Sequence, residues 1–156
     1  MTKPDGPTVD YPLGPALDFL QRLWQLDHAL EALSSRMQKR LGITAQQRLM
    51  LRCIGKYPGL AAGQLAVLLH LDPGTVSAAL SRLELKGLLE RRRDPRDPRR
   101  ASLGLTAAGR ALDRPAQGTA EDAVARLIAN VDPQDLAVTK TVVARLTTLL
   151  GAQLQD

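Results

Sequence analysis

The chain has 156 residues, enough for a single domain with a sizeable core. Its 21 Lys and Arg outnumber its 16 Asp and Glu, and this basic balance allows a polyanionic partner, either nucleic acid or an anionic membrane. No apolar run is long enough to span a bilayer, the N-terminus lacks the apolar segment of a signal peptide, and the one cysteine excludes an internal disulfide. We therefore expect a cytoplasmic protein that does not enter the membrane.

The first expected element is a long helix from Pro15 to about Leu41, after a loose arm that ends near Leu13. Its apolar residues recur at steps of three and four, which is helical periodicity, and Gly42 is a suitable stop. The apolar positions form more than one stripe. This predicts that the helix contacts two surfaces, one of which can belong to a second subunit.

Two shorter helices are expected next. Thr44 and Gln47 form a capping-box pattern, which predicts a helix that runs to about Lys56. Its inward residues are expected to be Leu49, Met50 or Cys53, and Ile54. After the break at Tyr57-Pro58-Gly59, a helix is expected at roughly 61–69, with Leu65, Ala66 and Leu69 inward and His70 in the left-handed conformation at its end.

The next helix begins with Asp72 as its cap and Pro73 in its first turn, and ends at Gly87. Its apolar stripe consists of Val76, Ala79, Leu80 and Leu83. The opposite side carries small and polar residues that can approach a DNA groove closely: Thr75, Ser77, Ala78, Ser81 and Arg82. Two short helices joined by a tight turn, the second with such a face, are typical of a helix-turn-helix.

A hairpin with an arginine-rich turn is expected after this helix. Its first arm starts at Leu88-Leu89-Glu90, its second arm alternates through Ala101, Leu103 and Leu105, and residues 94–99 form the loop. Six arginines (91, 92, 93, 96, 99 and 100) accompany two aspartates (94 and 97), a local charge of +4 within a chain of +5. Nearly all the excess charge therefore lies in ten residues.

This arginine cluster has three interpretations: contact with nucleic acid, contact with anionic lipid, and a solvated loop. Arginine binds phosphate in a bidentate way and fits a narrow minor groove, so the cluster favours nucleic acid. The candidate contacts are Arg92, Arg93, Arg96, Asp97, Arg99 and Arg100. We expect Asp97 to hold Arg99 in place by an ion pair.

The C-terminal third is expected to be helical and interrupted. Thr106 caps a helix that breaks near Pro115 and Gly118 and resumes through Ala123, Leu127, Ile128 and Val131. Asp132 and Pro133 then open a last helix. Apolar residues cover more than one face of this terminal helix, which predicts burial in a dimer.

The central stretch resembles the MarR family of bacterial transcription regulators. The matching residues are Leu71-Asp72, Thr75-Val76, Arg82-Leu83-Glu84, Lys86-Gly87-Leu88, Arg91-Arg92, Asp94-Pro95-Arg96-Asp97, Arg99 and Leu105-Thr106-Ala107-Ala108-Gly109. The resemblance implies a mainly α fold with an α+β winged helix-turn-helix. In that arrangement residues 1–156 form one domain, with a DNA-binding lobe at about 44–109 and dimerisation helices at about 13–41 and 110–154.

The resemblance further implies a homodimeric, ligand-responsive repressor that binds a pseudo-palindromic operator in double-stranded DNA. A small lipophilic or phenolic ligand is the implied effector. Two departures from the family pattern are Ala61, where a Ser or Thr cap is frequent, and Ala78, where a base-contacting Arg is frequent. A winged-helix protein-interaction module and a sequence-tolerant nucleic-acid binder remain alternatives.

Other candidate chemistry in the chain is limited. Trp24 and His28 lie one helical turn apart and can line a ligand cleft, although a packed Trp beside a partly exposed His also explains them. Cys53 lies among apolar residues, as a buried small hydrophobe does, rather than where a redox sensor is expected. Two histidines and one cysteine give no metal-ligand spacing, and we expect no cofactor and no enzymatic site.

Overall fold

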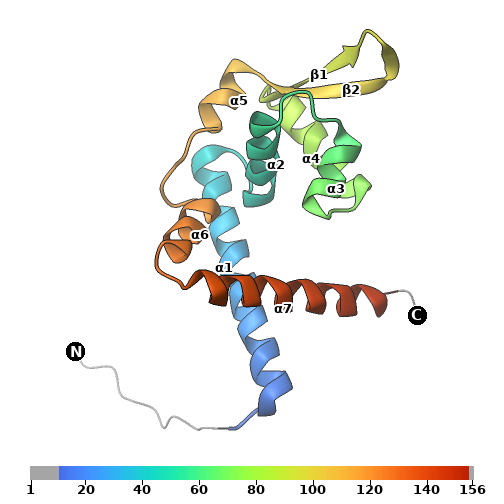
Figure 1. Ribbon diagram of the computed structural model, residues 1–156. Helices are drawn as coiled ribbons and strands as arrows, with labels where there is room; N and C mark the ends of the chain where they lie inside the picture. Colours follow the sequence, from blue (N-terminus) through green and yellow to red (C-terminus); the bar gives the residue numbers. More distant parts are fainter. Residues whose placement is uncertain (1–10, 155–156) are drawn as a thin grey trace, which may run out of the picture.

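The computed structural model describes residues 11–154, with the backbone alone for Asp94, Pro98, Arg99 and Arg100. The described elements, in chain order, are seven helices and one hairpin (Figure 1). They are α1 Gly14–Leu41, α2 Ala45–Lys56, α3 Ala62–Leu69, α4 Pro73–Leu85, β1 Leu89–Asp94, β2 Asp97–Leu105, α5 Ala107–Leu112, α6 Ala120–Ile128 and α7 Pro133–Ala152. The expected mainly helical class with a small β wing is confirmed.

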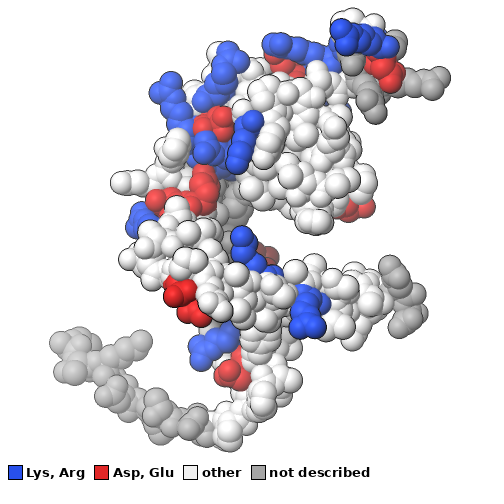
Figure 2. All heavy atoms as spheres, in the orientation of Figure 1, with Lys and Arg blue, Asp and Glu red and all other residues white. Residues whose placement is uncertain are grey.

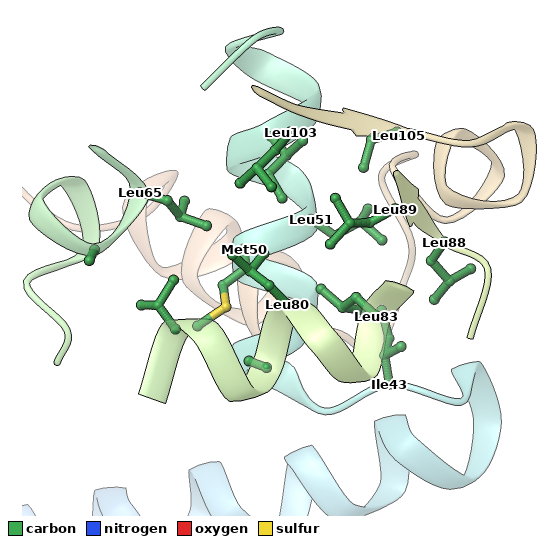
Figure 3. Packing of buried hydrophobic residues seen from close by; sticks show 14 residues of the cluster. Ile43, Met50, Leu51, Leu65, Leu80, Leu83, Leu88, Leu89, Leu103 and Leu105 are labelled. Carbon is green, nitrogen blue, oxygen red and sulfur yellow. The ribbon is translucent and has the colours of Figure 1, made fainter. Parts of the chain in front are cut away.

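The hydrophobic core lies where α2, α3, α4 and the hairpin meet (Figure 3). Its buried residues are Ile43, Met50, Leu51, Ile54, Leu65, Ala66, Val76, Ala79, Leu80, Leu83, Leu88, Leu89, Leu103 and Leu105. Burying a Leu, Ile or Met side chain fully contributes roughly 1.5–3 kcal/mol relative to leaving it exposed. These residues therefore hold α4 and the wing together as one rigid lobe.

The inward face of α2 differs from the expected one. Leu49 is 51% exposed, so the prediction that it packs inward is wrong, whereas Met50 and Ile54 are buried as predicted. Gln47 and Leu51 are buried as well, which makes the inward stripe 47, 50, 51 and 54 at the usual helical spacing. The neighbouring Arg48 is also buried, because it bonds to a different part of the chain.

The helix ends follow the signals in the sequence. Thr44 and Gln47 form the predicted capping box, and the Asp132 carboxylate accepts the Gln134 N–H at 2.7 Å at the start of α7. His70 has the predicted left-handed conformation, with φ of 51°. Ala61 has no side-chain oxygen to cap α3, and the Gln64 side chain instead accepts the Ala61 N–H at 2.9 Å.

The wing is an antiparallel hairpin with a shorter turn than expected. Residues 94–99 were predicted as a loop, but Asp94 pairs with Asp97 and only Pro95 and Arg96 form the turn. The register slips between Arg93 and Asp94, and this irregularity accommodates the residues between Asp97 and Ala101. The second strand is also bonded on its other side. The Leu103 N–H donates to the Leu60 carbonyl at 2.8 Å, and the Leu103 carbonyl accepts from the Gly59 N–H at 3.3 Å.

The join between the wing and α5 requires a glycine. A Cβ on Gly109 would overlap the Leu88 carbonyl oxygen, which is backbone and accepts the Thr106 N–H at 3.2 Å. The Thr106 hydroxyl accepts the Gly109 N–H at 3.1 Å and donates to the Gly87 carbonyl at 2.6 Å. These bonds hold the first turn of α5 against the start of the wing.

The remaining helices lie outside the lobe. In Figure 1, α1 runs away from the lobe, and α7 crosses α1 in this view. Met37 is the buried residue of α1, whereas α6 and α7 have no buried side chain. The predicted break after α5 is confirmed, but α6 ends at Ile128, so the expectation that it continues to Val131 is wrong. The Asn130 N–H bonds back to the Leu127 carbonyl at 3.0 Å, which tightens the helix end before Asp132 opens α7.

None of the helices in the described part of the chain is long and apolar enough to cross a lipid bilayer.

Candidate nucleic-acid interface

The outward face of α4 is formed by small and polar side chains. The predicted apolar stripe is confirmed, since Val76, Ala79, Leu80 and Leu83 are all buried. Their burial fixes the rotation of the helix about its axis. As a result, five candidate residues are exposed along one helix: Thr75, Ser77, Ala78, Ser81 and Arg82.

Hydrogen bonds within α4 define what this face can offer. The Asp72 carboxylate accepts the Thr75 N–H at 3.0 Å and caps the helix, while the Thr75 hydroxyl is exposed. The Ser81 hydroxyl donates to the Ser77 carbonyl at 3.0 Å, which leaves its oxygen as an acceptor. Arg82 makes no ion pair to any residue whose side chain is described, so its guanidinium is a ready donor to a base or phosphate.

Two polar contacts position α4 within the molecule. The Lys86 ammonium, just past the end of α4, donates to the Gly42 carbonyl at the end of α1. The Arg91 guanidinium on β1 bonds to the Glu84 carboxylate on α4 at 3.2 Å. Arg91 was not among the predicted site residues, because its partner lies seven residues earlier on another element. It links the wing to α4, and although the residue is exposed, its guanidinium is occupied by this ion pair.

The wing arginines point to two different faces of the hairpin. Side chains alternate along a strand, so Arg91 and Arg93 share the face of buried Leu89 and Arg92 lies on the other. Arg93 is exposed and has no ion pair with the described side chains. Arg92 is bonded to Glu90 and lines a pocket with Ser102, Gly104 and Arg110. Arg93 is therefore the freer of the two neighbouring cations.

The tip of the wing is described only in part. Arg96 is an exposed residue of the turn, and Asp97 begins β2. The side chains of Arg99 and Arg100 lie outside the described residues, and so does the predicted ion pair between Asp97 and Arg99. Figure 2 shows Lys and Arg side chains gathered at the wing end of the lobe.

The other candidate residues are dispersed. Trp24 is 66% exposed and His28 is also exposed, both on α1 and away from the wing. Cys53 is half-buried, and burial raises the pKa of its thiol while nearby Lys56 opposes the shift. Across residues 11–154, no three His, Cys, Asp or Glu side chains lie close enough together to hold a metal ion.

Comparison with known proteins agrees with this geometry. Residues 43–101 match the model of the MarR family. A 91-residue segment is 32% identical to an HTH-type transcriptional repressor of Mycobacterium tuberculosis, covering 58% of the chain and 66% of the repressor. The chain belongs to the MarR family. A second relative of this MarR chain is the HTH-type transcriptional regulator TtmR of Methylorubrum extorquens, 39% identical over 70 residues. That alignment covers 45% of the chain and 36% of TtmR.

Solved structures share the fold of this MarR chain over most of its length. The structure of the S. aureus MepR–DNA complex matches 86% of the chain and 97% of MepR, with a TM-score of 0.69 and 24% identity. The PcaV regulator from Streptomyces coelicolor, solved with its natural ligand, matches 90% of the chain and 96% of PcaV, with a TM-score of 0.66 and 27% identity. The MarR family consists of regulators rather than enzymes, as the sequence predicts.

Proposed function

We propose that this chain is a homodimeric, sequence-specific DNA-binding regulator that acts as a repressor. The observation that carries the proposal is the pairing of two features on one rigid lobe. The exposed small-residue face of α4 lies beside a wing that carries most of the excess positive charge. The Glu84–Arg91 ion pair and the shared core fix the two features relative to each other.

In this proposal α4 enters the major groove. The Ala78 methyl and the Ser77 and Ser81 side chains are short, so the backbone of the helix can come close to the base edges. Thr75 would bond a phosphate or a base, and Arg82 a guanine or a phosphate. Ala78 can contact a thymine methyl but offers no hydrogen bond.

The wing would lie in the flanking minor groove. Arginine is the side chain best suited to a narrow minor groove with strong negative potential. Among the described side chains, Arg93 is exposed and shares the strand face that turns toward α4. We propose that Arg93, Arg96, Arg99 and Arg100 supply most of the electrostatic affinity, with Asp97 orienting Arg99.

The dimer would be formed by α1, α6 and α7. Long apolar side chains remain exposed on all three helices, among them Leu17, Trp24, Leu26, Val124, Leu127, Ile128, Val138, Leu149 and Leu150. An apolar groove between α1 and α7, lined by Phe19, Val142, Leu146 and Leu149, continues the same surface. A solvent-exposed apolar surface over three helices is typical of an obligate interface, so a second copy of the chain is the proposed occupant.

A two-fold dimer predicts the form of the operator. Two symmetry-related α4 helices require a pseudo-palindromic site with half-sites about one helical turn apart. A small lipophilic or phenolic effector would bind near Trp24 and His28, between the lobe and the dimer helices. Its effect would be to favour a dimer geometry that does not match this spacing.

The decisive experiment is fluorescence anisotropy of the full chain with the DNA upstream of its own gene, against an excess of random DNA. Affinity should fall steeply with salt, since each neutralised phosphate adds about 0.9 to the log–log slope. The variant Ala78→Glu should abolish specific binding, because it places a carboxylate against the DNA. Val67→Glu on exposed α3 makes the same charge change and serves as its control. Equal binding by Ala78→Glu and Val67→Glu would contradict the assignment of α4.

A further inference from the structure

The connection between α5 and α6 is the least regular part of the described fold. Pro115 lies in it, and Gly118 has a φ of 67°, so residues 113–119 leave helical geometry between two helices. A helix break strips backbone carbonyls of their usual N–H partners, and buried or half-buried carbonyls then need other donors. The Thr119 hydroxyl donates to the Ala116 carbonyl at 2.7 Å, and the other side-chain donors come from α1 and α2.

Three arginines supply the donors from α1 and α2. Arg40 on α1 donates to the Gln117 carbonyl at 2.7 Å and to the Gly118 carbonyl at 3.2 Å. Arg52 on α2 donates to the Asp113 carboxylate at 3.0 Å and also to its carbonyl. Arg48, between them, makes the largest set of contacts. We call Arg40, Arg48 and Arg52 the arginine clamp.

Arg48 is the centre of the clamp. Its side chain is 1% exposed, and it donates at 2.6 Å to each of the Leu112 and Arg114 carbonyls. Its Nε donates to the Glu121 carboxylate of α6 at 2.5 Å. A buried guanidinium is tolerated only when it is paired and bonded in this way, so its position is strongly determined. One side chain of the lobe thus fixes both the end of α5 and the start of α6.

Little apolar packing duplicates this fixation. No side chain of α6 is buried, although its capping residue Thr119 is. The core of the lobe is formed by other residues of α2, namely Met50, Leu51 and Ile54, and does not require the Arg48 guanidinium. Polar bonds from the clamp therefore hold α6, and with it α7, at a set angle to the lobe.

We propose that the arginine clamp, through Arg48, sets the angle between the DNA-binding lobe and α6–α7 and thereby the half-site spacing that the dimer accepts. This inference rests on the proposed function, because spacing has meaning only for a dimer that binds two half-sites. Arg48 is in this sense a positioning residue for DNA recognition. It does not contact DNA, but it determines the distance between two α4 helices.

The test uses the full chain with Arg48→Met, which keeps an unbranched stem and removes the guanidinium. Arg126→Gln is the control, since Arg126 pairs with Asp122 inside α6 and is not part of the clamp. Two measurements follow. The first is binding to operators whose half-sites are moved apart in steps of one base pair. The second is the spin-label distance between Val67→Cys on α3 and Lys140→Cys on α7, in a Cys53→Ala chain diluted with unlabelled protein.

The expected result is that Arg48→Met remains folded but loses its spacing preference, so that the affinity ratio between the best and neighbouring spacings falls to about one. Its spin-label distance distribution should broaden, while Arg126→Gln keeps the wild-type values. An unchanged distance distribution and spacing preference in Arg48→Met would overturn the proposal. If Arg48→Met fails to fold, Arg40→Gln, at an exposed position of the clamp, gives the same test by the same two measurements. If the wild type binds none of the operators, the proposed function fails, and the distances alone decide the role of the clamp.

Discussion

Arg92 and Arg93 are adjacent arginines of β1, and exchanging each for alanine tests which face of the wing meets DNA. Both variants remove one positive charge at nearly the same place, so long-range attraction to DNA falls equally in the two. Arg93 is exposed without an ion-pair partner among the described side chains and shares the face of Leu89. Arg92 is bonded to Glu90 on the opposite face. The difference between the two variants therefore isolates direct contact.

The magnitudes follow from this geometry. Loss of one phosphate contact lowers the magnitude of the log–log salt slope by about 0.9. Over a fourfold rise in salt, the factor by which the affinity of Arg93→Ala falls should therefore be roughly 3.5 times smaller than the factor for wild type. At low salt it should bind more weakly than wild type by about 1 kcal/mol, or about fivefold, the usual net size of one hydrogen-bonded contact. Arg92→Ala should keep a slope close to that of wild type. Anisotropy titrations between about 50 and 200 mM salt measure both the salt slope and the affinity at low salt. Equal slopes for Arg92→Ala and Arg93→Ala would refute the assignment of faces.

Three further predictions concern stability, assembly and the thiol. Gly109→Ala should destabilise the fold by about 1–3 kcal/mol in urea unfolding at fixed protein concentration, because the new methyl meets the Leu88 carbonyl. Gly63→Ala, with open space around it, should be neutral or slightly stabilising. Equal stabilities of the two variants would contradict the close approach at Gly109. A chain cut before Asp132 should sediment as a monomer or unfold, and a stable dimer would exclude α7 from the interface. Since burial raises the pKa of the Cys53 thiol, its alkylation near neutral pH should be slower than that of free cysteine and should accelerate as pH rises; a faster rate would indicate an activated thiol.

Local signals predicted most of the element boundaries. Caps at Thr44, Asp72 and Asp132 work through hydrogen bonds to residues two or three positions away, which are visible in the sequence. The apolar stripe of α4 was also predictable, because it follows from helical spacing alone. The outward face, and hence the candidate DNA contacts on α4, followed from the same spacing.

Features that depend on distant partners were not predictable. The burial of Arg48 could not be predicted from the sequence, because its hydrogen-bond partners lie 64 to 73 residues later in the chain. The turn at Pro95 and Arg96 was predicted too long, since two aspartates and two prolines suggested a loop while strand pairing extended the hairpin. Leu49 was expected inside on hydrophobicity, but the stripe of α2 was decided by packing against α3, α4 and the wing.

The bonding of the wing has a consequence for the behaviour of the free protein at high concentration. An open strand edge is a template on which a second molecule can add a strand, which leads to aggregation. The edge of β2 is occupied by the segment around Leu60, whose carbonyl accepts from Leu103. The edge of β1 remains, and it carries three consecutive arginines, 91 to 93. Because like charges repel an incoming copy, this row of arginines, which includes the proposed DNA contact Arg93, also keeps the unbound regulator from polymerising through its wing.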